Sequence, residues 1–462
     1  MRSTRRVLAA AAAVSLCATA AMADQQASQE QRIAQLQQRI ADLEARQATN
    51  AREMAATIDQ VLRDAEKRSQ LLASGGDVSA GYDNGFFIRS GAWELRPGIH
   101  YQARYVVNYR SDTGGDKADE VEDGFEIRRM RLDLAGTALT KDLTYYIQWD
   151  TNRNNGDFWL LEAWARYMFS EDWGVRLGQL KDPVTHEFVQ SSKQLLAVDY
   201  SLADMMLGGG VASYTQGVLL NYGSYKNDKN PIFIEAGITD GAGQMNTNFV
   251  GRGEPLDVDP TITGAAGAHS LDWGLAGRIE CKAMGKWADY AQWSPKGTKE
   301  DLLVFGLGGD WSQGGDGDLV LATADVQYES PQGFGLYGAV LYRYLDDRMS
   351  GRAEDTSDWG FLVQGSYMLN PAWEIYARYD VVLLDHDVVF GNGDTEDTFH
   401  EVTIGVAYYL GKDGSAWNRA KITVDLTWLP NGAPSAYTGS DILDNNSGNV
   451  EWILRAQFQL LL

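Results

Sequence analysis

Cysteine is nearly absent from this chain of 462 residues, which contains only Cys17 and Cys281. Cys17 lies in a predicted export signal, which has a basic start, a short apolar run and an Ala-Met-Ala cleavage sequence ending at Ala23. We therefore predict that residues 1–23 are a signal peptide that is removed; a membrane anchor that stays in place is the alternative. Without Cys17, Cys281 has no partner, which excludes an intrachain disulfide. An exported chain of this length then needs another source of stability, such as a closed hydrogen-bonded barrel.

The chain also lacks long apolar runs and a positive net charge. After the signal, no segment has about 20 consecutive apolar residues, which excludes a membrane-spanning helix. The net charge is −23, and this acidity argues against nucleic acid as a partner. The mean hydropathy of −0.32 does not exclude a transmembrane barrel, because apolar and polar residues alternate along the strands of such barrels.

Residues that would supply enzymatic or metal chemistry are few. The five histidines have no metal-binding spacing, and Gly-Gly-Asp-Gly-Asp at 314–318 lacks the oxygen spacing of a calcium loop. His400 begins a predicted strand, but no serine in a nucleophile setting accompanies it. We therefore predict no enzymatic activity, no cofactor and no metal. His186 in a long connection could tune a pore with pH; an ordinary polar loop residue is the alternative.

Residues 24–73 differ from the rest of the chain because they contain no glycine or proline. Ile33, Leu36, Ile40 and Leu43 occupy a and d positions of a heptad repeat, and the seam becomes polar afterwards. We predict a short periplasmic coiled-coil helix that helps to assemble subunits. A lone or partly disordered helix is the alternative.

The remainder of the chain has the pattern of β-strands separated by turns. Residues 74–98 are predicted to be a linker with a short hairpin, and residues 99–462 a barrel. In residues 125–136, apolar residues alternate with Arg129 and Arg131, which is the period of a strand. Sixteen long strands are predicted, beginning near residues 99, 125, 143, 158, 173, 213, 230, 271, 301, 318, 333, 358, 372, 400, 419 and 450.

The connections and the last strand favour a transmembrane barrel over a soluble sandwich of two stacked sheets. Short turns, such as the one at 169–174, alternate with long connections, as in outer-membrane barrels. The last strand keeps apolar residues at every second position from Val450 to Leu462. A sandwich would also have to protect its exposed edges. We therefore predict an all-β fold, a 16-stranded antiparallel transmembrane β-barrel with an N-terminal coiled-coil helix.

If the apolar face of these strands contacts lipid, the polar face lines a water-filled lumen. The predicted lining carries similar numbers of both charges, which gives a transverse field and a moderate ion preference. Its cations are Arg129, Arg131, Arg166, Arg176, Arg343, Arg378, Lys421 and Arg455, and its anions are Asp133, Asp150, Glu162, Asp325, Glu374, Asp380 and Asp425.

The long connection at 181–212 carries apolar residues that are out of place on an external surface. Phe188, Leu196, Leu202 and Met206 need a wall to pack against. We predict that this segment folds into the barrel and narrows the pore. An external flap or a subunit contact is the alternative.

Several stretches between residues 86 and 222 resemble the phosphate-selective porins O and P of Gram-negative outer membranes. They read "RRMRLDLAGT", "YYIQWD", "LLEAWARY", "VRLGQLKDP", "SSK" and "YSLAD". The resemblance implies a trimer of sixteen-stranded barrels, each with a constricting third loop. It also implies passive diffusion past an anion site that is made of basic residues and one carboxylate.

The family's constriction residues can be carried over by motif. Its arginine pair, fourth-strand carboxylate, fifth-strand lysine and loop serine-lysine pair fall on Arg128 and Arg129, Glu162, Lys181, and Ser192 and Lys193. Arg131 and Arg166 of the predicted lumen face complete the candidate anion-binding constriction. Strict alternation puts Arg128 and Arg129 on opposite faces, and a bulge or a strand end could bring both into the mouth.

The sequence departs from the family around "SLAD". Where the family commonly has Glu-Arg, this chain has Asp199 and Tyr200. Where the family often has arginines, this chain has Met-Met-Leu-Gly-Gly-Gly at 205–210. Because arginine contacts to phosphate are strong, their loss is expected to weaken phosphate binding.

These features together predict an outer-membrane porin, a passive diffusion channel for small hydrophilic solutes, including anions such as phosphate. We expect a homotrimer in outer-membrane lipid that has no nucleic acid partner. The alternative is a structural envelope protein in which the barrel anchors a periplasmic coiled coil. The polar lumen, the infolded loop and the short coil favour the pore.

Overall fold

The computed structural model describes residues 78–83, 85–111, 119–151, 156–245, 271–315, 317–346, 354–390, 393, 395–434 and 449–462. The predicted signal peptide and coiled coil lie outside the described residues. Residues 79–462 form one compact unit. Among the residues described, no helix is long and apolar enough to cross a bilayer.

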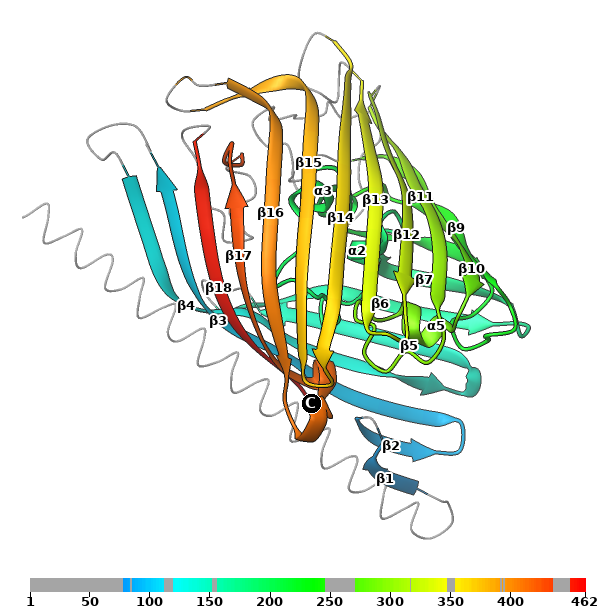
Figure 1. Cartoon of the computed structure of the whole chain (residues 1–462). Coiled ribbons are helices and arrows are strands. Elements are labelled where there is room, and N and C mark those ends of the chain that lie inside the picture. Colours follow the sequence, from blue (N-terminus) through cyan, green and yellow to red (C-terminus); the bar gives the residue numbers. More distant parts are fainter. Residues whose placement is uncertain are drawn as a thin grey trace, which may run out of the picture. The chain divides into compact units, whose positions relative to one another are not determined.

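Sixteen antiparallel strands, β3 to β18, pair in chain order and close into a barrel where β18 pairs with β3 (Figure 1). A short hairpin of β1 (Val78–Tyr82) and β2 (Phe86–Ser90) precedes them. The barrel strands are β3 Trp93–Ser111, β4 Asp119–Ala138, β5 Thr140–Thr151, β6 Phe158–Met168, β7 Trp173–Lys181, β8 Tyr214–Tyr222, β9 Ile232–Thr239, β10 Trp273–Met284, β11 Leu302–Gly314, β12 Gly317–Glu329, β13 Phe334–Leu345, β14 Thr356–Asn370, β15 Trp373–Val389, β16 Thr395–Tyr409, β17 Ala420–Leu429 and β18 Glu451–Leu461.

The predicted 16-stranded antiparallel barrel is confirmed, since each predicted segment corresponds to one of these strands. β3 and β4 begin earlier than predicted, at Trp93 and Asp119. The added start of β3 pairs through the backbone with the end of β4, as in Glu94 opposite Thr137, and the added start of β4 pairs with the end of β3, as in Ser111 opposite Asp119. Backbone pairing does not require the apolar alternation on which the prediction depended, so these ends carry little sequence signal.

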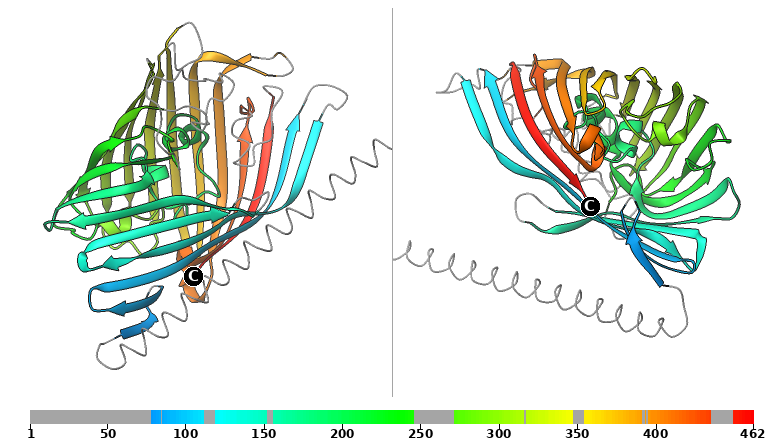
Figure 2. Two further views of the ribbon diagram at one scale, coloured as in Figure 1. Left: turned by 180° about the vertical axis from the view of Figure 1, so that it is seen from behind. Right: turned by 60° about the horizontal axis from the view of Figure 1, so that its bottom comes forward.

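The helices are short and lie in the connections. They are α2 His186–Val189, α3 Leu202–Leu207, α4 Gly209–Ala212 and α5 Trp287–Tyr290, with the 3₁₀ turns η1 Lys412–Gly414 and η2 Trp417–Arg419. The first three belong to the connection between β7 and β8, which we call the constriction loop (residues 182–213). Figure 1 shows α2 and α3 inside the ring of strands, and the right-hand view of Figure 2 shows the same green segment enclosed by the wall.

The two faces of the wall differ as predicted. Every charged residue of the predicted lumen set is buried or half-buried, whereas large apolar side chains such as Phe125, Leu307 and Ile404 are exposed on the outer face. Aromatic side chains pair on neighbouring strands near the strand ends. Trp428 and Trp452 stack with ring centroids 5.6 Å apart. Such paired rings near strand ends are typical of the interfacial girdles of membrane barrels.

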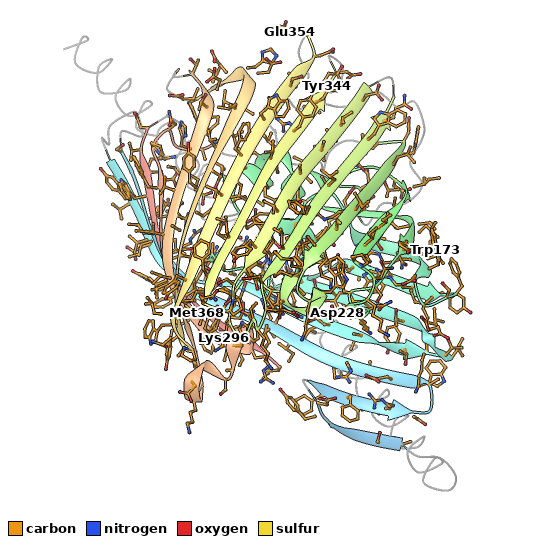
Figure 3. The ribbon with its side chains drawn as sticks, turned by 45° about the vertical axis from the view of Figure 1, so that its right-hand side comes forward. Trp173, Asp228, Lys296, Tyr344, Glu354 and Met368 are labelled. Carbon is orange, nitrogen blue, oxygen red and sulfur yellow. The ribbon has the colours of Figure 1, made fainter. Side chains whose placement is uncertain are left out.

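The barrel has one end with mostly short connections and one with mostly long ones. Asp228, Lys296 and Met368 mark the first end, and Tyr344 and Glu354 mark the second (Figure 3). Leu462 bonds to Ile99 through both backbone groups, so the barrel closes near the C-terminus. The connection between β10 and β11 is an exception to the short end, because it contains α5.

Candidate functional site

The constriction loop packs its apolar side against the wall formed by β12 to β16. Leu202, Met206 and Leu207 belong to one buried cluster with Tyr337 and Leu341 of β13. The predicted infolding of this segment is confirmed, because Phe188, Leu195, Leu196, Val198, Leu202 and Met206 are all buried. Burial against the wall, rather than helix propensity, holds these short helices in place.

Two glycines allow the loop to lie this close to the wall and to itself. A Cβ atom on Gly308 of β11 would lie 1.9 Å from the carbonyl oxygen of Val184. A Cβ atom on Gly209 would lie 2.1 Å from the Cβ atom of Phe188. The glycines at 208–210 therefore pack a tight turn inside the lumen.

Polar groups of the wall bind the loop backbone. Asp425, Glu401 and Asp380 accept hydrogen bonds from the amides of Val198, Leu202 and Ala203, at 3.0, 2.7 and 2.9 Å. Within the loop, Ser201 caps α3 by accepting from the Asp204 amide at 3.1 Å, and Glu187 accepts from the Ser201 hydroxyl at 2.6 Å. These bonds satisfy backbone groups that a buried loop would otherwise leave unpaired.

A β-bulge brings both predicted arginines into the lumen. Gln102 pairs with Arg129, while the next residue, Ala103, pairs with Ile127. Arg128 is therefore the extra residue on β4, and its side chain joins that of Arg129 on the inner side. A second bulge lies on β6, because Gln148 pairs with Glu162 and Trp149 with Leu160. Leu161 is the extra residue there, and both Leu161 and Glu162 are buried. The predicted conflict between motif and alternation is resolved by the first bulge.

The loop serine and lysine lie against the same side of the wall. Arg131 donates to Asp150 at 2.8 Å and to the Ser192 hydroxyl at 3.1 Å. Lys193 forms an ion pair with Asp133. The structure thus brings Arg131, Ser192 and Lys193 together at the narrowed part of the lumen.

The other predicted residues serve different contacts. Lys181 donates to the carbonyl oxygens of Phe188 and Gln190, at 2.7 and 2.8 Å, and so holds the start of the loop. Arg166 pairs with Glu235 at 3.1 Å, away from the serine-lysine pair. Glu162 accepts from the indole of Trp164 at 3.0 Å. Across the described ranges, no group of three or more His, Cys, Asp or Glu side chains could hold a metal ion.

Sequence reasoning missed Arg104 and the role of Asp199. The Asp199 carboxylate lies 2.9, 3.0 and 3.1 Å from Arg128, Arg129 and Arg104. Arg104 comes from β3, and its guanidinium also pairs with Glu126. The alternating pattern of β3 could have placed Arg104 in the lumen, but no local signal connects it to a residue of the loop.

In the ion pairs whose cation lies on β4 to β7 or on the loop, the positive partner is the more exposed one, whereas Arg104 of β3 is less exposed than its partner Glu126. The difference in favour of the cation is largest in three pairs. The exposed side-chain fractions are 21% for Lys193 against 7% for Asp133. They are 24% for Arg166 against 6% for Glu235, and 17% for Arg128 against 0% for Asp199. A mobile ion next to these pairs therefore meets positive charge first, since each carboxylate lies behind its cation.

Comparisons with known proteins bear on the family and the fold. A family model described as phosphate-selective porin O and P matches residues 99–267. Over these residues the chain is similar to this family. The porin is 24% identical over 379 residues to Porin O of Pseudomonas aeruginosa, an alignment that covers 71% of this chain and 83% of that relative. It is an outer-membrane channel, and its family and fold point to a channel rather than an enzyme.

Solved structures share the fold of the porin at low sequence identity. An anion-selective porin from Comamonas acidovorans matches with a TM-score of 0.53 at 13% identity, over 80% of this chain and 100% of that one. The high-pH structure of Pseudomonas putida OprB matches with a TM-score of 0.50 at 10% identity, over 80% of this chain and 94% of that one. These matches show the barrel architecture.

The constriction loop of the porin is expected to dock more tightly at pH 5 than at pH 8. Burial raises the pKa of Glu187 to about 7 and that of Asp204 to about 6, and their mutual repulsion adds to the shift of Glu187. Because both pKa values exceed those of an undocked loop, docking is strongest at low pH and weakens as pH rises toward 8. Hydrogen exchange of the loop amides at several pH values measures this trend, and Glu187→Gln should flatten it. Exchange that slows toward pH 8 would contradict the assignment.

Proposed function

We propose that this porin conducts small hydrophilic anions by passive diffusion along the β4 to β9 side of the constriction loop. The observation that carries the proposal is the exposure of the cations there, with the carboxylates behind them. The opposite side of the loop packs against β13 to β16 in a buried apolar cluster. A charged surface in a narrow, low-dielectric passage raises the local concentration of counter-ions.

The proposed constriction comprises the residues that motif and alternation predicted. Arg128, Arg131, Ser192 and Lys193 contribute the donors that a passing anion meets, while Lys181 holds the loop that presents two of them. Arg166 lies along the same wall and adds positive charge beyond the narrow part. No covalent step is involved, so ion selectivity depends only on the electric field in the passage and on the width of the passage.

We further propose that the porin functions as a homotrimer in outer-membrane lipid, with the N-terminal helix in the periplasm. The exposed apolar outer face and its aromatic pairs fit contact with lipid and with further barrels. The short-turn end, which holds the C-terminus, would face the periplasm. Residues 24–73 would supply the coiled coil that joins the subunits.

The experiment that tests the proposal is a reversal-potential measurement on the purified protein in a planar bilayer under a tenfold KCl gradient. We expect the sign of the reversal potential to show that chloride permeates better than potassium. The anion-to-cation permeability ratio should be several-fold and should fall at high salt, because salt screens the charges. A reversal potential near zero or of the cationic sign would overturn anion conduction. No conductance at all would overturn the open passage.

A further inference from the structure

The carboxylate of Asp199 lies where three arginines converge. Its Oδ2 atom accepts from Arg104 Nη1 at 3.1 Å and from Arg128 Nε at 2.9 Å. Its Oδ1 atom accepts from Arg129 Nη2 at 3.0 Å and from Arg128 Nη2 at 3.3 Å. Asp199 is fully buried, and its own carbonyl oxygen accepts from Arg378 at 2.9 Å. The side chain is therefore held among the arginines at both of its oxygens and through its backbone.

The three arginines form a complete recognition site for a small oxyanion. Arg128 approaches with two nitrogens as a fork, while Arg104 and Arg129 each add one donor to a different oxygen. This is the arrangement with which guanidinium groups bind carboxylate and phosphate. The site is built by the barrel wall, because the bulge on β4 supplies two arginines and β3 supplies the third. The loop supplies only the anion that fills it.

Asp199 stays ionised in this setting. Burial alone would raise the pKa of Asp199, but Arg128, Arg129 and Arg104 hold that pKa well below its usual range. Protonation at mildly acidic pH would therefore not release the carboxylate. The arginines also need it, since they would otherwise be several like charges close together with little solvent around them.

We propose that Asp199 is a tethered competitor, which occupies an oxyanion site of Arg104, Arg128 and Arg129 and thereby limits how tightly this porin binds phosphate and similar oxyanions. The inference rests on the proposed anion conduction. A ligand attached to the chain competes at a high effective concentration, on the order of millimolar or more. A free oxyanion must displace it, so the site is weak in this chain although its arginines are all present.

Asp199 places a negative charge into the basic cluster of Arg104, Arg128 and Arg129. Phosphate affinity is then lowered because the site is already occupied. Substituting Asp199 should therefore increase phosphate affinity.

The test compares Asp199→Ala with Asp150→Ala. Both variants raise the lumen charge by one, but Asp150 pairs with Arg131 and does not touch the three arginines. Inorganic phosphate is titrated against chloride current, and against the detergent-solubilised protein by calorimetry. We expect Asp199→Ala to lower the half-blocking phosphate concentration at least tenfold and Asp150→Ala to lower it by no more than about threefold. Equal shifts in the two variants, or no shift in Asp199→Ala, would overturn the competitor.

Two further variants keep the test decisive. In the Asp199→Ala background, Arg129→Gln should return the phosphate affinity toward that of the unsubstituted protein, because it removes one donor of the uncovered site. If Asp199→Ala does not give a folded barrel on unheated gels, Asp199→Asn keeps the shape of the side chain without its charge and should show the same direction. Failure of the proposed function is read separately, from the reversal potential of the unsubstituted channel, because calorimetry does not require conduction.

Discussion

Replacing Lys193 by glutamate is expected to turn the anion preference of this porin into a cation preference. Lys193 lies at the narrowed part of the lumen, pairs with Asp133 and keeps 21% of its side chain exposed. The substitution places two carboxylates opposite each other and swings the local charge by two. A unit charge about 4 Å away in water changes the energy of an ion by about 1 kcal/mol, so the swing of about 2 kcal/mol corresponds to a change of roughly tenfold or more in permeability ratio.

The reversal potential under a KCl gradient measures this change, and two variants calibrate it. Lys193→Gln removes the charge without reversing it and should give an intermediate potential. Lys141→Glu makes the same charge change at an exposed position beside the turn between β4 and β5, and should leave the potential nearly unchanged. If Lys193→Glu keeps the anion preference, ions do not pass beside this residue and the proposed path is wrong.

The barrel could be predicted from the sequence because its signal is repeated. Each strand needs only alternation and a turn, and sixteen weak signals in a row support one another. The last strand is an example, since its outer side chains from Trp452 to Phe458 are exposed and its inner ones are buried. The infolding of the loop could also be predicted, because exposing apolar side chains such as Leu202 and Met206 to water is unfavourable.

The arrangement within the constriction could not be derived in the same way. At a bulge, side chains no longer alternate between the two faces of the strand. The residues around Arg128 carry no sequence signal that predicts a bulge on β4. The contact between Asp199 and Arg104 joins residues 95 positions apart, and it depends on how far the loop crosses the lumen. Backbone bonds of the loop to Asp380, Glu401 and Asp425 decide that distance, and these are tertiary contacts that no periodicity encodes.

The second large effect is expected from Arg378→Leu, which should release the constriction loop while the barrel remains folded. Arg378 donates to the carbonyl oxygens of Asp199 and Tyr200, at 2.9 and 3.2 Å, and to Glu401 at 2.6 Å. It is also close to Glu187 and Asp380, at 3.5 and 3.8 Å. Without it, Glu187 and Asp380 lose the arginine beside them and Glu401 keeps only its longer-range interaction with Arg455. Breaking a buried ion pair in this way costs about 3–5 kcal/mol in other proteins.

We expect the loop, rather than the barrel, to detach. Water can replace the contacts of the loop one at a time, whereas it cannot replace the closed backbone hydrogen bonds of the barrel. Single-channel recordings should show a conductance raised about twofold or more with frequent flickering, and trypsin should cut at Lys193 faster than in the unsubstituted protein. Arg176→Leu is the matched control, since Arg176 pairs with Glu235 of the neighbouring wall at 2.5 Å; it removes a lumen arginine at a comparable site and should leave trypsin cleavage unchanged. Unaltered conductance and cleavage in Arg378→Leu would mean that apolar packing alone holds the loop, and that the buried charges serve another purpose.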